Sequence, residues 1–138
     1  MKKMMFTLLV TVFSLSGFAQ KATNSAESVV KFKELKHNFG KIKQGVPVTH
    51  DFEFTNVSSG AVIVETATAS CGCTTPTWPQ APVMKSKTDK IKAGFNAAAP
   101  GPFEKTVYVK LKGVDVPMEL KIAGEVLSAA EYDKLNKK

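Results

Sequence analysis

Short runs in which apolar and polar residues alternate, separated by turn residues, fill most of the chain. The clearest run covers residues 46–55, and its predicted inner face is formed by Val48, His50, Phe52 and Phe54. Similar runs cover residues 61–69, 90–95, 103–111 and 116–122. About seven short strands of this kind, each with one apolar face, predict an all-β fold built as an antiparallel β-sandwich.

The predicted core consists of the residues on the apolar faces of these runs. In the last run, Val116 and Met118 are expected to face inward together with the residues that follow them. The other expected core residues are Phe52, Phe54, Val62, Val64, Phe95, Val107, Val109, Leu120 and Ile122.

The segment of residues 72–87 shows no alternation and contains Pro76, Pro79 and Pro82 at intervals of three. Long irregular segments are uncommon in compact domains and are often functional. Proline is tolerated at the edges of sheets, so we interpret this segment as a stiff edge that crosses from one sheet to the other.

The C-terminal residues 127–138 are expected to form a short helix or a tail. Ser128 and Glu131 have the spacing of a capping box, in which each residue satisfies a backbone N–H of the other. Tyr132 and Leu135 would lie on one face of this helix and contact the domain.

The N-terminus has the features of an export signal. A lysine pair precedes a short apolar run, and Gly17-Phe18-Ala19 supplies small residues for cleavage. The apolar run is shorter than the roughly 20 residues that a membrane-spanning helix needs. The mature chain would therefore be periplasmic or secreted, without a membrane span. The predicted division is a signal peptide over residues 1–19, a flexible leader over residues 20–29, the sandwich over residues 30–126 and the helix or tail over residues 127–138.

The net charge of the full chain is +7, and all 19 basic residues are lysines. Arginine is the preferred reader of guanine edges and the better bidentate partner of phosphate. A lysine excess without arginine on an exported protein argues against nucleic acid as a partner. Weak attraction to anionic surfaces or glycans is compatible with this charge.

The two cysteines, Cys71 and Cys73, are separated only by Gly72, and three interpretations of the pair are open. In an oxidising compartment the pair is expected to close as a local disulfide, for which Gly72 gives backbone freedom. A strained, exposed bridge would also suit a redox couple. Alternatively, the thiolates form a metal site that His37 and His50 complete. Copper(I) is then favoured over zinc, because copper(I) needs only two soft thiolates.

Other conspicuous residues have structural explanations. His50 lies on an apolar strand face, where a backbone carbonyl commonly satisfies a partly buried histidine. His37 precedes Asn38-Phe39-Gly40 and is expected to bond within that turn. Trp78 is expected to pack as a core or lid residue. Asn56-Val57-Ser58 matches a glycosylation acceptor, but a hairpin-turn asparagine explains it.

The order of several local patterns resembles that of a known family. These patterns are His37-Asn38-Phe39-Gly40, Phe52-Glu53-Phe54, Ser70-Cys71-Gly72-Cys73-Thr74, Trp78-Pro79 and Pro100-Gly101-Pro102-Phe103. Residues 31–126 resemble a bacterial family of exported immunoglobulin-like domains of unknown function that carry a C-G-C-T motif. That family is similar to the hydin and major-sperm-protein β-sandwiches. The resemblance implies an immunoglobulin-like sandwich of about seven strands and export, but no established activity. One departure is the segment 84–88, where such sequences often have a Pro-Gly turn.

These observations favour an exported, non-enzymatic interaction or structural module of the cell envelope, with an envelope protein or glycan as partner and no cofactor. The alternative is thiol–disulfide redox chemistry or copper or zinc handling through Cys71 and Cys73. Gly72, Thr74 and Trp78 are the loop residues that we expect to contribute to binding.

Overall fold

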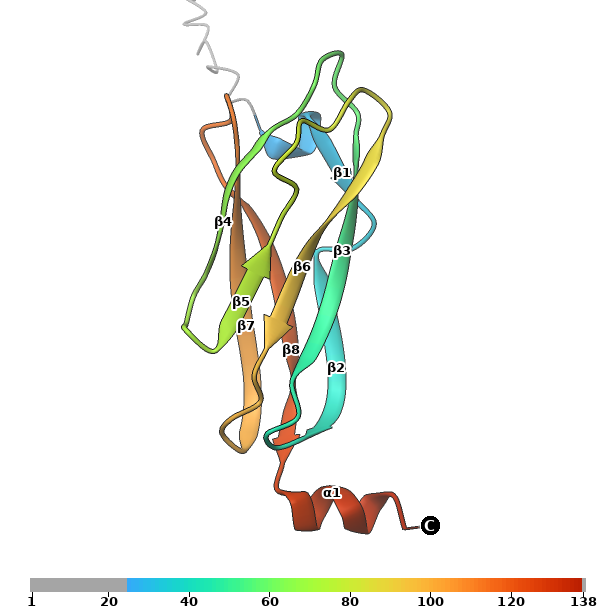
Figure 1. Ribbon diagram of the computed structural model, residues 1–138, viewed down its shortest axis with the longest axis vertical. Helices are drawn as coiled ribbons and strands as arrows, with labels where there is room; N and C mark the ends of the chain where they lie inside the picture. The colour runs from blue at the N-terminus through green and yellow to red at the C-terminus, as the bar shows by residue number, and fades with distance from the viewer. Residues whose placement is uncertain (1–24, 138) are drawn as a thin grey trace, which may run out of the picture.

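The computed structural model describes residues 25–137, and within this range eight strands form two four-stranded sheets that pack face to face (Figure 1). The β-sandwich fold is therefore confirmed, with one strand more than expected. The predicted signal peptide and the first residues of the predicted leader lie outside the described residues. Among the described residues, no helix is long and apolar enough to cross a membrane.

Sheet A is fully antiparallel. Its strands are, in spatial order, β1 (Val30–Phe32), β3 (Val48–Asn56), β6 (Thr88–Phe95) and β5 (Thr74–Thr77). β5 falls within the segment that showed no alternation, and it occupies an edge of the sheet, as expected for a proline-containing strand. The chain reaches β5 from an edge strand of the other sheet, so the predicted crossing is present.

Sheet B is antiparallel except at one edge. Its strands are, in spatial order, β2 (Lys36–Lys43), β8 (Met118–Leu127), β7 (Gly101–Leu111) and β4 (Val64–Ala69). β2 runs parallel to β8, which differs from the fully antiparallel sandwich that we expected. The register of this pair shifts between Asn38 and Lys41, where Gly40 adopts a positive φ of 68°. A glycine is well suited to this position because side chains disfavour such a backbone conformation.

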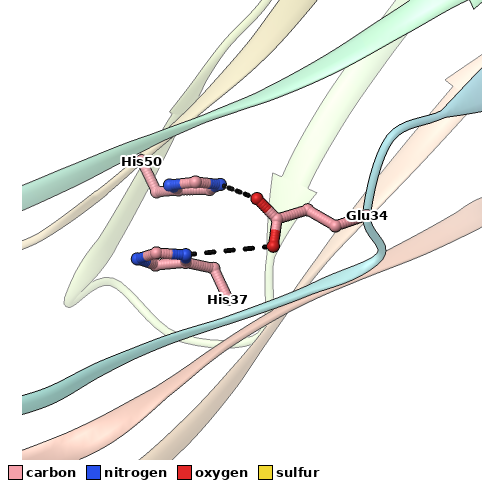
Figure 2. Close-up of side chains that lie close together, drawn as sticks. All are labelled: Glu34, His37 and His50. Carbon is pink, nitrogen blue, oxygen red and sulfur yellow. Dashed lines mark hydrogen bonds and ion pairs between the residues drawn. The ribbon is translucent and has the colours of Figure 1, made fainter.

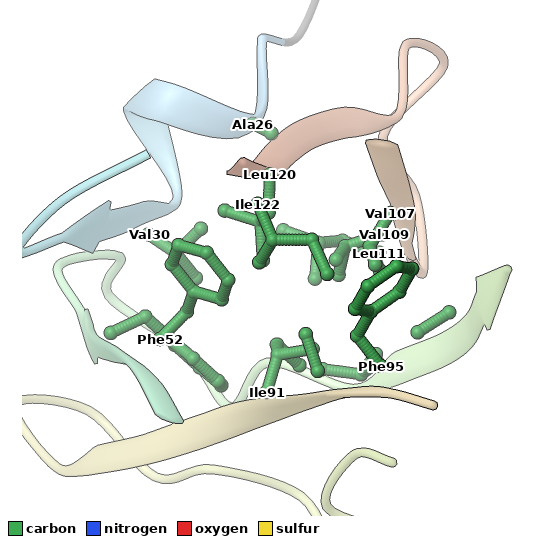
Figure 3. Close-up of a cluster of buried hydrophobic side chains, with 14 of the residues drawn as sticks. Ala26, Val30, Phe52, Ile91, Phe95, Val107, Val109, Leu111, Leu120 and Ile122 are labelled. Atoms are coloured by element: carbon green, nitrogen blue, oxygen red, sulfur yellow. The ribbon is translucent and has the colours of Figure 1, made fainter. Parts of the chain in front are cut away.

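The core fills the space between the two sheets (Figure 3). The largest fully buried side chains are Phe52, Phe54, Ile91, Leu111, Leu120 and Ile122, and every residue of the expected core list is buried. Val116 is the exception in its run, because β8 begins only at Met118 and leaves Val116 57% exposed in the preceding turn. Alternation thus identified the core wherever a run is a regular strand.

Both ends of the described chain contain helical structure, where a flexible leader and a short helix or tail were predicted. Residues Ala26–Ser28 form the 3-10 helix η1, and Ala26 is buried, so this part of the expected flexible leader belongs to the folded domain. At the other end, α1 (Ala129–Leu135) begins at the predicted capping box. Of the two residues expected to face the domain, Tyr132 is half-buried, whereas Leu135 is 53% exposed.

Candidate functional site

The disulfide turn connects β4 to β5, at the edge of the sandwich where the chain leaves sheet B for sheet A. Cys71 and Cys73 form a disulfide, with their Cα atoms 5.3 Å apart. Both cysteines are half-buried. The hydroxyl of buried Thr74 lies 3.7 Å from the sulfur of Cys71 and 3.9 Å from that of Cys73. Gly72 is exposed and does not adopt a positive φ, so the turn does not use the conformational freedom that we expected.

The turn also removes a backbone donor from the outer edge of β5. The carbonyl of Cys73 accepts a hydrogen bond from the Asn96 N–H at 3.1 Å, on the side of β6. In an antiparallel pair, the backbone groups of successive residues point alternately toward and away from the neighbouring strand, so those of Thr74 and Pro76 point away from β6. The Thr74 N–H donates to the Cys71 carbonyl at 3.3 Å, and proline has no N–H. These two positions therefore offer no free donor to an added strand, which blunts this edge against strand pairing.

A pocket of about 210 Å³ lies beside Cys73. The rings of Phe95 and Phe103 stack at one side of it, with centroids 4.1 Å apart and planes inclined by 19°. Prolines of the β6–β7 connection and the start of β7 add further apolar lining, and Lys105 contributes a positive charge. The pocket combines an apolar wall with one cation.

Trp78 lies beyond β5, in the connection that leads to β6. It is partly buried and packs against the core, as expected for a core or lid residue. Asn56 is fully buried; its amide nitrogen donates to the carbonyls of Gly60 and Val83, and its oxygen accepts from Ser58. Asn56 thus has the predicted turn role, but the turn is not a hairpin, because β3 and β4 belong to different sheets.

A second group of polar side chains lies at the opposite edge of the sandwich (Figure 2). Glu34, in the link between β1 and β2, accepts a hydrogen bond at 2.8 Å from Nε2 of His50 on β3. Its other carboxylate oxygen lies 4.0 Å from Nδ1 of His37 on β2. The two imidazole rings stack with centroids 3.6 Å apart and planes inclined by 5°.

This arrangement differs from both expectations for the histidines. His50 is satisfied by a carboxylate and not by a backbone carbonyl, and His37 belongs to a strand and not to a turn. Burial lowers the pKa of His37 from its ordinary value of 6.5, the neighbouring His50 lowers it further, and the Glu34 carboxylate partly opposes both effects. The neutral imidazole is therefore favoured at this position.

The structure thus places the four predicted metal-site residues in two separate groups. His37 and His50 meet at the β1–β2 edge, whereas Cys71 and Cys73 pair with each other at the β4–β5 edge. Glu34 was missed in the sequence, where its only signal is its position three residues before His37.

Comparisons with known proteins identify the fold but no activity. The family model DUF1573, described as a protein of unknown function, matches residues 30–126. No curated protein sequence matches the chain.

Several solved structures have the same architecture at low sequence identity. The PapD-like domain 7 of human CEP192 superposes with a TM-score of 0.66 at 10% identity, over 86% of this chain and 99% of that domain. The MSP family member WR4 of C. elegans gives 0.50 at 10% identity, over 72% and 99%. A Porphyromonas gingivalis W83 protein of unknown function gives 0.60 at 10% identity, over 70% of this chain, which spans only 46% of that protein.

Proposed function

The chain belongs to the DUF1573 family, whose function is unknown, and we propose that it is an exported, non-enzymatic interaction module of the cell envelope. Its immunoglobulin-like, PapD-like fold is consistent with an interaction module. The finer assignment depends on one observation, the pocket beside the disulfide.

The size and lining of this pocket suit a protein partner. Pockets that enclose small-molecule ligands usually measure about 300–1,000 Å³, whereas this pocket measures about 210 Å³. A space of that size accommodates one apolar side chain. The stacked rings of Phe95 and Phe103 supply a rigid apolar wall, and such fixed aromatic surfaces are typical of binding anchors. The blunted edge of β5 favours recognition through this pocket over strand addition.

Site-specific photo-crosslinking in living cells tests the binding proposal. A photoreactive residue replaces Ala99, which lines the pocket and is exposed, and a control variant carries it at Tyr108, which is exposed on β7 away from the pocket. We expect a discrete protein adduct from position 99 and none of the same size from position 108. No adduct at position 99, or the same adduct from both positions, would overturn the proposal.

Export rests on the sequence of residues 1–19 and needs a separate test. N-terminal sequencing of the protein purified from its native cells should begin at Gln20, in the envelope or secreted fraction. A chain that retains Met1 and fractionates with the cytoplasm would contradict export without affecting the pocket.

Thiol–disulfide exchange is the second candidate, and the position of Thr74 favours it. Its hydroxyl lies within 3.9 Å of both sulfurs, where it could donate to a thiolate and stabilise the reduced pair. Equilibration of the oxidised protein with glutathione redox buffers, read by intact mass, gives the reduction potential. A potential as high as that of known envelope oxidants, together with oxidation of a reduced substrate protein, would establish exchange as the function. A bridge that stays closed in all physiological buffers would exclude it.

A further inference from the structure

Three potential metal ligands from three parts of the chain converge where the chain passes from β1 to β2. Glu34 belongs to the connection itself, His37 to the edge of sheet B, and His50 to sheet A. One ligand atom from each of these residues lies within 4.8 Å of the other two. The cluster therefore spans the gap between the two sheets.

The two imidazole rings are held in place by their neighbours. Phe39 contacts the His37 ring edge-on, with centroids 4.7 Å apart, and Phe52 contacts the His50 ring in the same way, also at 4.7 Å. The two histidine rings also stack on each other. Because an imidazole binds an ion in the plane of its own ring, one of the two parallel rings must tilt before both histidines reach the same ion.

We propose that Glu34, His37 and His50 bind a divalent transition metal ion, with zinc as the reference case, and that the ion clips sheet A to sheet B at this edge. Two imidazoles and one carboxylate are a typical ligand set for zinc and related ions. Two nitrogen ligands favour such an ion over magnesium or calcium, which prefer oxygen.

The distances are close to those of a zinc site. With metal–ligand bonds of about 2.0–2.2 Å in a tetrahedron, neighbouring ligand atoms lie about 3.3–3.5 Å apart. The two observed separations bracket this value, because one Glu34 oxygen lies 2.8 Å from Nε2 of His50 and the other lies 4.0 Å from Nδ1 of His37.

Besides the tilt of one ring, binding requires a change of proton position on His50. The ion takes the place of the proton that Nε2 shares with Glu34, and the imidazole then carries its proton on Nδ1. The side chains of Glu34 and His37 are 44% and 30% exposed. Solvent therefore has access to the ion, and water completes its coordination.

Zinc titration of the tag-free, chelator-treated mature protein tests this site. With the disulfide closed, the cysteines cannot act as ligands, so binding must depend on the histidines. We expect one zinc ion per chain by calorimetry. His50→Gln, His37→Gln and Glu34→Gln should each weaken binding more than about 10-fold, since even the loss of an outer-shell group costs about 10- to 100-fold.

Two control variants should bind zinc like the wild type. Glu53→Gln removes a carboxylate of β3 that pairs with Lys33 outside the cluster, and Cys71→Ser/Cys73→Ser removes both sulfurs. Circular dichroism of every variant checks folding, and exposed Glu34 provides a ligand variant least liable to unfold. Cobalt substitution provides a second measurement, because bound tetrahedral cobalt has a visible absorption band. Absence of saturable zinc binding, or zinc binding unchanged in the ligand variants, would overturn the proposal.

Discussion

At one edge of the sandwich the chain crosses from β4 to β5 through the disulfide turn, and at the opposite edge it crosses from β1 to β2 past Glu34. The first crossing is fixed by a covalent bond between residues two positions apart. The second is fixed by the hydrogen bond between His50 and Glu34 of the link, and by the stack of His37 on His50, which belong to different sheets. The first adjoins an apolar pocket, whereas the second is a cluster of polar, titratable side chains.

This difference predicts that disulfide reduction and metal binding affect the stability of the domain to different extents. The disulfide constrains only its own turn, so its reduction should loosen β5 and the adjoining pocket. The Glu34–His37–His50 cluster connects the two sheets, so a bound ion there should stabilise the whole domain. The edge with the covalent bond is therefore expected to contribute less to global stability than the edge without one.

A cavity in the core, which packs against both edges, should destabilise both of them and have the largest effect on the free energy of unfolding. Phe52 is fully buried on β3 and contacts the His50 ring. Phe52→Ala should lower the free energy of unfolding by about 3–5 kcal/mol, because it leaves a cavity between the sheets. Urea denaturation measures this loss. Val57→Ala, at a position 51% exposed, should stay within about 0.5 kcal/mol of the wild type. A loss below 1 kcal/mol for Phe52→Ala would show that the core does not couple the two edges.

Zinc should stabilise the protein through one edge only. A free zinc concentration 100 times the Kd adds about 2.7 kcal/mol to the free energy of unfolding of a protein that binds it in the folded state alone. Thermal denaturation should show the same gain in the wild type and in Cys71→Ser/Cys73→Ser, and no gain in His50→Gln. Addition of a chelator should reverse the gain. A gain that disappears with the cysteines would assign the metal to the other edge.

The contrast between the edges also explains what could be predicted from the sequence. The sandwich follows from period-two alternation, which is a local property of each strand. The parallel pairing of β2 with β8 does not follow, because both pairing directions give the same alternation. β5 was not predicted as a strand, because its side chains, including Pro76, do not alternate between apolar and polar.

The candidate sites follow the same division. The disulfide is local, and Cys71-Gly72-Cys73 indicates it in the sequence as one of three interpretations. The histidine cluster is not local, because His37 and His50 meet only once two sheets have formed, and Glu34 has no apolar pattern to mark it. The pocket arises from Phe95 and Phe103, which belong to different sheets, so no sequence window contains it.

Removal of the disulfide should have a smaller effect on stability than removal of the core or addition of zinc. For a closed loop this short, the chain-entropy relation gives no more than about 1.5 kcal/mol, and we expect Cys71→Ser/Cys73→Ser to lose no more than this. The local effect should be a change in the fluorescence of Trp78, which packs beyond β5. Reduced wild-type protein should behave like the double variant. A double variant that is unfolded at room temperature would show that the turn supports the whole domain.

The smallest expected effect concerns α1, which is attached to the histidine-bearing edge. Lys43 of β2 pairs with Asp133 of the helix at 2.8 Å. Both the hydroxyl and the backbone N–H of Ser128 donate to the Glu131 carboxylate, and these bonds hold the pKa of Glu131 below its ordinary value of 4.5. Because the folded-state pKa is lowered, the stabilisation is present above pH 4.5 and is lost as the pH falls below that value.

Carbon-13 chemical shifts of residues 129–135 measure this loss directly. In the wild type, the helical shifts should decrease below pH 4.5, while the shifts of the core strands stay constant. Glu131→Gln keeps a side-chain oxygen that accepts from Ser128 but does not titrate, so its helix should be independent of pH over the same range. If both proteins lose the helix at the same pH, the Ser128–Glu131 capping box does not control the helix. In that case α1 would depend on its contact with β2, which includes the ion pair of Lys43 with Asp133.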